Sequence, residues 1–289
     1  MNVLVLGGTG SIGAPVVKTL VQRGHTVSGL ARSEESSAAL ASAGARPVEG
    51  SILNPDGWLD ELRNVDAVIH AAAVWGDDMT DIDSRVVHSL LRAMPQYSDD
   101  KTLLYTGGCW HYGATGDVVA DESTPYVSFS GFDVGLQTMQ AVLSAQSVRG
   151  MVIHPAMVYE RDGGVFDHFY NDADELGHVR VIGNADVRWP LVHRDDLALV
   201  YTLMVEQGQS GDVYNAATQS GVRVGDIASA VARSRNLDPE ARELEVSAAI
   251  EEFGFTAEGY AIDQQMSGDK ARAQLGWQPV HENVFDVIG

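Results

Sequence analysis

The chain has 289 residues, of which 45% are hydrophobic, and this composition suits one large globular unit or a nucleotide-binding domain with a smaller lobe. Its formal net charge of −21 argues against nucleic acid or an anionic membrane as a partner. Cys109 is the only cysteine, no apolar run is long enough to span a membrane, and the first predicted strand begins at Asn2, so we expect a cytoplasmic protein without a disulfide, anchor or signal peptide.

The first 24 residues predict a strand, a glycine turn and a helix. A short apolar run, Val3–Leu6, is typical of a buried parallel strand, and apolar residues recur at helical spacing after Gly13. This arrangement directs backbone N–H groups and the helix dipole at an anion, usually the pyrophosphate of a dinucleotide. An ordinary tight turn is the alternative. We expect cofactor contacts from the turn itself: Gly7, Thr9, Gly10, Ser11, Ile12 and Gly13.

A second strand is predicted from His25 to Ala31, followed directly by Arg32 and Ser33. In dinucleotide-binding folds the residue that ends this strand faces the adenosine ribose, where an acidic side chain favours NAD. The guanidinium of Arg32 instead suits a 2′-phosphate, with Ser33 as a small donor beside it. The sequence therefore favours NADP over NAD. The alternative is a solvated surface arginine, because Glu34 and Glu35 add negative charge nearby.

Further strands are predicted at 46–48, 65–70, 103–106 and 150–154, with a helix from about 131 to 147. Strands that alternate with helices predict an α/β protein with a Rossmann-type doubly wound parallel sheet, whose ligands lie at the carboxyl ends of the strands. Small residues after the fourth strand let a ligand lie against the backbone. The strand ends therefore predict these additional cofactor contacts: Ser51, Ile52, Ala71, Ala72, Ala73, Thr106, Pro155 and Val158.

Beyond Tyr159 the alternation of strands and helices loosens. Helices are expected at 165–176 and 224–234, another is introduced by the segment 188–198, and a strand at about 212–217 returns to the sheet. We therefore expect a Rossmann domain over 1–159 and a region over 160–289 that is mainly a substrate lobe. Three tryptophans, together with Arg188 and His193, predict a pocket for a small, fairly apolar or aromatic substrate: Trp75, Trp110 and Trp189.

Seven motifs occur in one order along the chain: 7–13, 70–73, 112–113, 154–159, 191–198, 213–215 and 275–279. On these residues the chain resembles the extended short-chain dehydrogenase/reductase superfamily, the branch that includes sugar-nucleotide epimerases and dehydratases. The resemblance implies an NAD(P)-binding Rossmann domain with a small C-terminal lobe that closes over the substrate. In such proteins the helices that flank the fourth and fifth strands often pair, which leaves a homodimer as one option.

The catalytic residues of that superfamily do not carry over. Its members use a Tyr-x-x-x-Lys pair and a Ser or Thr after the fifth strand, but these positions fall at Phe132, Leu136 and Gly108 here. The three lysines of the chain, at 18, 101 and 270, lie far from this region in sequence. The chain therefore resembles the atypical members of the superfamily.

Substitute catalytic groups are expected near the end of the fifth strand, and the candidates are Tyr112, His111 and Tyr126. His111 has an ordinary pKa near neutrality, although a structural histidine is the more frequent case. Without a lysine, Tyr126 keeps its ordinary high pKa and is limited to donating a hydrogen bond, or a proton to a strong base. Cys109 is a weaker candidate, and Thr106 and Tyr159 complete the group.

The function favoured by these residues is an NADP-dependent, atypical reductase or dehydrogenase. It would transfer hydride to or from a carbonyl or conjugated alkene of a small, fairly apolar molecule. The alternatives are an NADP-binding regulatory or sensor protein without turnover, and a non-redox isomerase or epimerase. No metal site is expected, and Asp195 and Asp196 are interpreted as acidic residues at the start of a helix rather than as catalytic carboxylates.

Overall fold

The structure is a computed structural model that describes residues 1–74, 76, 78–127 and 133–288. Trp75 and Phe132, both singled out above, lie outside the described residues. Among the residues that are described, no helix has the length and hydrophobicity needed to cross a membrane.

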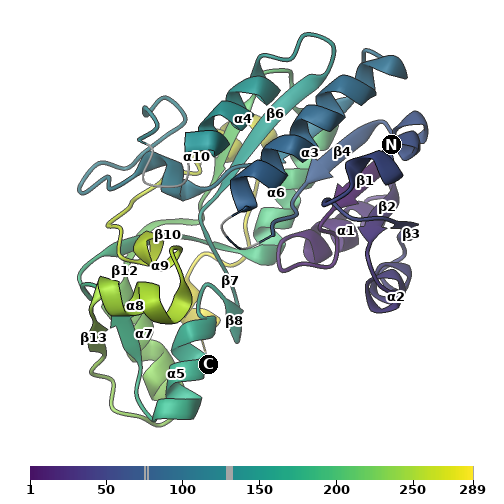
Figure 1. Ribbon diagram of the computed structural model, residues 1–289. Coiled ribbons are helices and arrows are strands. Elements are labelled where there is room, and N and C mark those ends of the chain that lie inside the picture. Colours follow the sequence, from purple (N-terminus) through teal and green to yellow (C-terminus); the bar gives the residue numbers. More distant parts are fainter. Residues whose placement is uncertain (75, 77, 128–132, 289) are drawn as a thin grey trace.

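A seven-stranded parallel sheet forms the centre of the molecule (Figure 1), which confirms the predicted Rossmann-type α/β fold. The order of its strands across the sheet is β11-β6-β5-β4-β1-β2-β3. The bounds are Asn2–Leu6 for β1, Thr26–Ala31 for β2, Arg46–Glu49 for β3, Ala67–His70 for β4, Thr102–Thr106 for β5, Arg149–Pro155 for β6 and Val213–Ala216 for β11.

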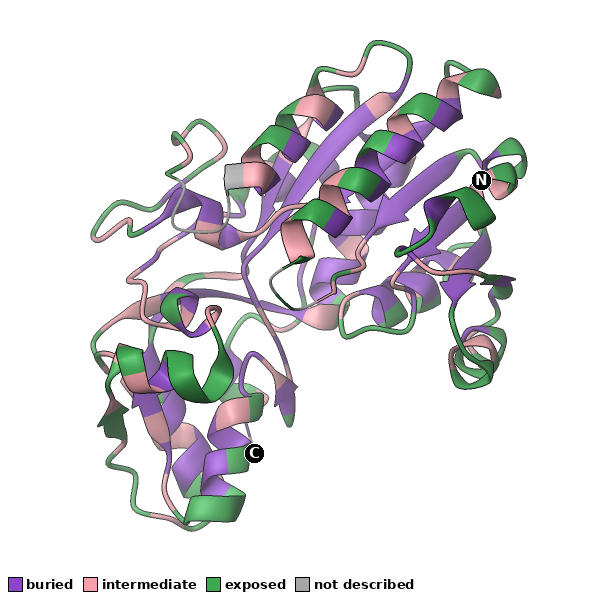
Figure 2. Cartoon of the chain, viewed as in Figure 1, coloured by how far each residue is buried: buried purple, intermediate pink, exposed green. Residues whose placement is uncertain are grey.

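Helices cover both faces of the sheet. Because strand side chains alternate, Val3 and Val5 of β1 enter one hydrophobic core, while Leu4 and Leu6 enter the other. Figure 2 accordingly shows buried strands between helices that are exposed on their outer faces. The first core is covered by α1 (Gly13–Gln22), α2 (Glu34–Ser42), α6 (Arg194–Gln207) and α10 (Asp269–Leu275), and the second by α3 (Met79–Ala93) and α4 (Asp133–Leu143).

A smaller lobe follows the sixth strand. Its four-stranded sheet has the order β12-β10-β7-β8, and a two-stranded parallel sheet joins β9 to β13. The bounds are Met157–Glu160 for β7, Gly163–Gly164 for β8, Arg180–Ile182 for β9, Arg188–His193 for β10, Gln219–Arg223 for β12 and Arg242–Leu244 for β13. The helices of the lobe are α5 (Asp167–Leu176), α7 (Val224–Ser234), α8 (Val246–Phe253) and α9 (Ala257–Tyr260).

Short 3₁₀ helices complete the chain, at Pro55–Gly57, Leu59–Asn64, Met94–Gln96, Cys109–Tyr112 and Val284–Asp286. The segment 188–198, expected to introduce a helix, is first the strand β10 and becomes α6 only at Arg194. Helix α6 packs against α1, and β11 pairs with β6, so the C-terminal half also contributes to the central sheet and its cover. The two halves of the sequence are thus interleaved in space.

Candidate cofactor and substrate site

The glycine turn between β1 and α1 is packed tightly against the end of β4. Gly7 has φ +83°, and a Cβ added there would lie 2.6 Å from the carbonyl oxygen of Ala71. A Cβ on Gly13 would lie 2.0 Å from the carbonyl oxygen of Gly7, so a side chain at either position would displace backbone. Helix α1 begins without a side-chain cap and without an acidic residue in its first turn. Its N-terminal amides are therefore well suited to the pyrophosphate of a dinucleotide.

Arg32 lies exposed at the end of β2 and makes no ion pair with any other described residue. Its charge is therefore available for a phosphate. The hydroxyl of Ser33 has a structural task, because its oxygen accepts a hydrogen bond of 3.2 Å from the backbone N–H of Ser36 and caps α2. Ser51 and Ile52 follow β3 in a turn that is held by Trp58, whose indole N–H donates to the carbonyl of Ser51 at 2.9 Å.

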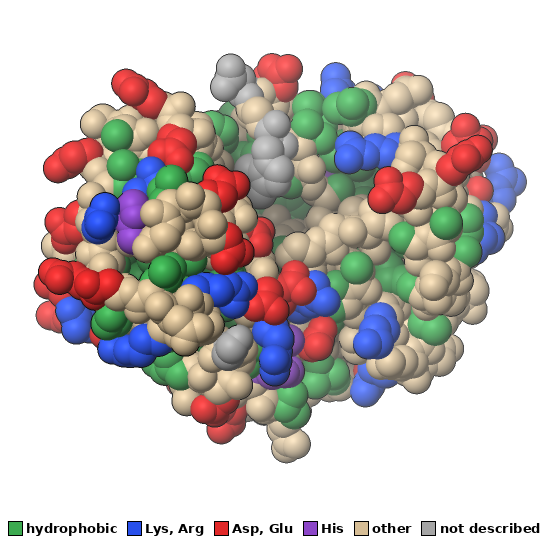
Figure 3. Space-filling model, turned by 90° about the horizontal axis from the view of Figure 1, so that it is seen from below, with side chains coloured by type: hydrophobic (Ala, Val, Ile, Leu, Met, Phe, Trp, Pro, Cys, Tyr) green, Lys and Arg blue, Asp and Glu red, His purple; other side chains and the backbone are tan. Residues whose placement is uncertain are grey.

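A cavity of about 570 Å³, here called the central cavity, opens at the carboxyl ends of β4, β5 and β6. It extends from the glycine turn to α5 and α9 of the lobe, and Figure 3 shows a hollow between the two halves of the molecule. Residues predicted from sequence that line it are Ser11, Ile12, Ala71, Ala72, Ala73, Thr106, Cys109, Trp110, His111, Pro155 and Val158. Half of the predicted cofactor contacts therefore lie around one space.

His111 lies in the 3₁₀ helix after β5 and lines the central cavity. Burial lowers the pKa of its imidazole to about 4, with the charge of Asp83 acting in the opposite direction. Helix α4 approaches the ring closely, since a Cβ on Gly135 would lie 3.2 Å from Cε1 of His111. At neutral pH the cavity therefore contains a neutral imidazole, which can donate or accept a hydrogen bond.

Tyr112 and Tyr126 do not line the central cavity. The Tyr112 hydroxyl donates to Oδ1 of Asn215 at 2.8 Å, and the Tyr126 hydroxyl lies 2.9 Å from Nε2 of His154. Burial raises the pKa of both phenols. These two tyrosines therefore form a hydrogen-bond network behind the cavity, because the 3₁₀ helix turns Tyr112 towards β11 instead of towards the ligand space. Tyr126 packs against His111, with ring centroids 6.3 Å apart, but of the three candidates His111 alone lines the cavity.

His154 at the end of β6 orders this network. Its Nδ1 accepts a hydrogen bond of 3.1 Å from the backbone N–H of Gly108. Burial lowers the pKa of His154 to about 3, so the ring is neutral and carries its single proton on Nε2. Nε2 consequently donates to the oxygen of Tyr126. His154 is a structural residue that fixes the loop from which His111 projects.

Sequence reasoning missed an acidic group in the cavity. The Tyr105 hydroxyl donates to Oδ2 of Asp83 at 2.6 Å, and Oδ1 of Asp83 lies 3.0 Å from Nε2 of the buried His70. Asp83 and Tyr105 both line the cavity, and burial and the neighbouring carboxylate raise the pKa of Tyr105 well above its ordinary value. No sequence signal identified Asp83, because nothing in its spacing distinguishes it from Asp81 on the same amphipathic helix.

Two of the superfamily's catalytic positions lie within the described residues, and neither has the usual side chain: Gly108 replaces the serine or threonine, and Leu136 replaces the lysine. Gly108 lines the cavity, and Leu136 on α4 is half-buried. No lysine lines the cavity along the described part of the chain: Lys101 donates to the carbonyl of Val65, and Lys270 donates to that of Val213 at 2.7 Å. Burial raises the pKa of Cys109 to about 12, which keeps its thiol protonated and unreactive.

Three residues expected in the substrate pocket have structural roles instead. Trp189 is buried and its indole N–H donates to the carbonyl of Tyr260 at 3.0 Å. Arg188 forms an ion pair of 2.7 Å with Asp263. Nδ1 of His193 accepts from the backbone N–H of Asp195 and caps α6. None of the three lines the central cavity. They were misplaced because the lobe's strand β10 was not recognised in the sequence.

Asp196 is also structural. Its carboxylate accepts hydrogen bonds of 2.9 Å from the backbone N–H groups of Val280 and His281, and so ties the C-terminal segment to α6. Within the described residues, His193, Asp196 and His281 are the one group whose ligand atoms are close enough to hold a metal ion, within 4.8 Å of one another. A hydrogen bond between His281 and Asp196 and the stacking of the His193 and His281 rings, with centroids 3.6 Å apart, already account for their proximity.

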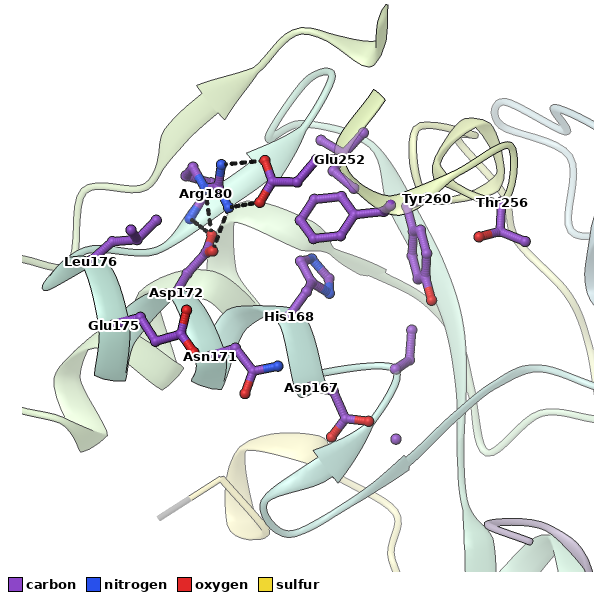
Figure 4. A pocket seen from close by; sticks show the side chains of 14 residues that line it. Asp167, His168, Asn171, Asp172, Glu175, Leu176, Arg180, Glu252, Thr256 and Tyr260 are labelled. Atoms are coloured by element: carbon purple, nitrogen blue, oxygen red, sulfur yellow. Dashed lines mark hydrogen bonds and ion pairs between the residues drawn. The ribbon is translucent and has the colours of Figure 1, made fainter. Parts of the chain in front are cut away.

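A second cavity of about 430 Å³, here called the lobe cavity, adjoins the first (Figure 4). It is formed by α5, β9, α8 and α9, and it shares Gly164, Val165, Asp167 and Tyr260 with the central cavity. Figure 4 shows Arg180 of β9 held between the carboxylates of Asp172 and Glu252 at one side of this space. The two cavities together could therefore accommodate a ligand that extends from the central sheet into the smaller lobe.

Comparison with known proteins agrees with this fold. Residues 3–217 match the model of the NAD dependent epimerase/dehydratase family. The uncharacterized protein C2A9.02 of Schizosaccharomyces pombe is 28% identical over 99% of this chain and 97% of its own length. A 4-hydroxy-2-methyl-3-oxo-4-farnesyl-3,4-dihydroquinoline-1-oxide ketoreductase of Stigmatella aurantiaca is 23% identical over 100% of this chain and 96% of its own. Human epimerase family protein SDR39U1, solved with NADPH, superposes with a TM-score of 0.78 at 21% identity, covering 99% of this chain and 97% of that one.

Proposed function

The chain belongs to the NAD-dependent epimerase/dehydratase family, and we propose that it is an atypical NADP-dependent reductase or dehydrogenase within it. The substrate would be a small, fairly apolar molecule with a carbonyl group or a conjugated alkene. The main observation behind the proposal is the central cavity. It is one continuous space that extends from the N-terminus of α1 to the neutral imidazole of His111. A ketoreductase among the full-length relatives supports the same reaction class.

The residues of the cavity suit the two parts of such a reaction. NADPH, when bound, supplies a hydride. The glycine turn and α1 would hold its pyrophosphate, and the small side chains of Ala71, Ala72 and Ala73 leave space along the backbone. The N–H of the neutral His111 imidazole would donate a hydrogen bond to the substrate oxygen as negative charge develops on it. This contact would take over the orienting task that the missing serine and tyrosine perform in typical relatives.

Arg32 supports the choice of NADP over NAD. Its guanidinium has no competing carboxylate partner among the described residues, and α2 begins directly beside it. The human relative was solved with NADPH, whereas the family description names NAD. A charge-assisted contact to the 2′-phosphate is the physical basis of the preference.

A binding protein without turnover is the competing function, favoured by the absence of a tyrosine–lysine pair from the described part of the cavity. The extension of the cavity into the lobe favours the enzyme, because a cofactor sensor has no use for a second space beyond the nicotinamide end.

Loss of NADPH absorbance, followed over a panel of aromatic and aliphatic ketones and enones, tests the proposal. With a substrate found, His111→Ala should lower kcat by about tenfold or more while leaving the Kd of NADPH unchanged. His88→Ala, on the exposed face of α3, is the matched control and should behave as wild type. An unaltered kcat in His111→Ala would remove His111 from the mechanism, and tight NADPH binding with no oxidation across the panel would favour the sensor.

A further inference from the structure

The residues that line the lobe cavity indicate which chemical group binds there. This inference depends on the proposed function only because it calls the ligand a substrate. Because this cavity shares Asp167 and Tyr260 with the central cavity, a molecule with its reactive carbon near His111 would place its remote end here. The side chains that line the lobe cavity therefore select the chemistry of that end.

The one cation among the described lining residues is already neutralised. Arg180 donates to both oxygens of Asp172, at 2.9 and 2.7 Å, and to both oxygens of Glu252, at 2.8 Å each. These four bonds occupy the guanidinium in two forked pairs. Arg180 is thus not available for a ligand phosphate or carboxylate.

The remaining charge in the lobe cavity is negative. Asp167 and Glu175, both solvent-exposed residues, line it without an ion pair to any described residue, and partial burial and the nearby Glu160 raise the pKa of the Asp167 carboxyl. Burial lowers the pKa of His168 to about 4, so this imidazole adds no positive charge at neutral pH. Four carboxylates thus face one guanidinium among the described lining residues. The residues outside the described ranges contain no lysine or arginine in sequence to offset this.

Aromatic rings complete the lining. The ring centroids of His168 and Tyr260 are 5.3 Å apart, and those of His168 and Phe253 are 6.5 Å apart. The Arg180 guanidinium already lies over the Phe253 ring, 5.8 Å from its centroid. Aromatic rings and carboxylates around one space form an environment that can stabilise an ammonium group, through cation–π attraction and direct charge pairing. The same environment repels a diphosphate, because no free cation among the described lining residues compensates the negative charge.

We propose that the lobe cavity binds the end of the substrate remote from the cofactor and that this end carries a positively charged amine. The protein would then act on amine-bearing carbonyl compounds or enones, and anionic nucleotide sugars would be excluded from this cavity.

Binding of three matched probes tests the proposal without turnover. Phenethylamine is cationic at neutral pH, phenethyl alcohol is its neutral counterpart and phenylacetate its anionic one. Titrations monitored by protein NMR should show phenethylamine binding most tightly, at least about tenfold more so than phenylacetate. Phenylacetate or uridine diphosphate binding in the lobe cavity as tightly as the amine would overturn the proposal.

Variants locate the interaction. Glu175→Gln and Asp167→Asn should each weaken phenethylamine binding by about threefold, and the double variant by about tenfold, with little change for phenethyl alcohol. Asp99→Asn removes an exposed carboxylate just before β5, at the opposite end of the sheet, and should leave all three affinities unchanged. Equal effects of Asp99→Asn and Glu175→Gln would show that the preference is only a consequence of net charge, and would refute the site.

The two proposals fail separately in these measurements. Oxidation of NADPH by uncharged ketones with no competition from phenethylamine would leave the reductase standing and remove the amine subsite. If the protein turned over no carbonyl compound but bound phenethylamine tightly, and the Asp167 and Glu175 variants weakened that binding, the amine subsite would stand and the reductase would be removed.

Discussion

Gly107 packs so closely against His154 that a Cβ on the glycine would lie 2.5 Å from Nδ1 of the imidazole. The next residue, Gly108, donates its backbone N–H to the same nitrogen at 3.1 Å. His154 is fully buried and is also bonded to Tyr126 through Nε2, so the ring has no room to move away. This contact joins the ends of β5 and β6 and fixes the start of the loop that carries His111.

Substitutions at the two glycines should therefore differ sharply. Gly107→Ala should lower the free energy of unfolding by about 2 kcal/mol or more, because the new methyl group displaces the buried imidazole. Gly108→Ala should be neutral or slightly stabilising, since no atom lies within 4 Å of its Cβ position and its φ of 179° is extended. Urea denaturation of both variants measures the difference, and equal destabilisation would show that His154 does not impose this constraint.

Tyr112 should matter for stability and not for catalysis. Tyr112→Phe leaves Oδ1 of the buried Asn215 without its donor, and we expect a loss of about 1–2 kcal/mol in unfolding free energy. Tyr97→Phe, which removes an exposed hydrogen bond to Asp60, is the control and should cost less than about 0.5 kcal/mol. A Tyr112→Phe enzyme of normal stability but strongly reduced kcat would restore Tyr112 as a catalytic candidate.

Buried neutral histidines predict acid sensitivity. Burial lowers the pKa of His168 to about 4 from an ordinary value of 6.5, so below pH 6.5 the unfolded chain binds a proton that the folded chain refuses. The contribution of the neutral His168 to the free energy of unfolding is therefore complete above pH 6.5 and is lost as the pH falls towards 4. His168→Phe keeps an aromatic ring and removes this proton, so its loss of stability between pH 6.5 and 5 should be smaller than that of wild type, by on the order of 1 kcal/mol. Parallel losses in the two proteins would refute the burial of a neutral His168.

Arg32 should discriminate between the two cofactors. Arg32→Ala removes the cation expected to contact the 2′-phosphate, and NADPH affinity should fall by about tenfold while NADH affinity stays nearly unchanged. Arg242→Ala, an exposed arginine of the lobe strand β13, controls for the general loss of positive charge. Equal losses for NADPH and NADH in Arg32→Ala would contradict a phosphate contact.

Local patterns were enough to predict the sheet and the glycine turn. The β1 run, Gly7, Gly13 and the following helix each carry their signal within a few residues, and the carboxyl ends of parallel strands must meet at one edge. His111, which follows β5, accordingly lines the central cavity. The lobe was harder, because β7 follows β6 after a single residue and β10 runs directly into α6, so no turn signal separates either strand from its neighbour.

The direction in which a side chain points was the other feature that could not be predicted from the sequence. Tyr112 is the last residue of a 3₁₀ helix that directs its hydroxyl at Asn215, about a hundred residues away, and no spacing rule predicts such a partner. Asp83 and Tyr105 meet only because α3 packs over the end of β5. Tyr260 reaches the cavities from a helix of four residues, too short to produce a periodic pattern.

Titration of the purified protein with NADPH and NADH, followed by energy transfer from tryptophan to the reduced nicotinamide, tests the central claim most directly. We predict saturable binding of NADPH that is at least about tenfold tighter than that of NADH. Binding of neither nucleotide would contradict the claim, because the turn at Gly7–Gly13 would then be only a tight connection between β1 and α1.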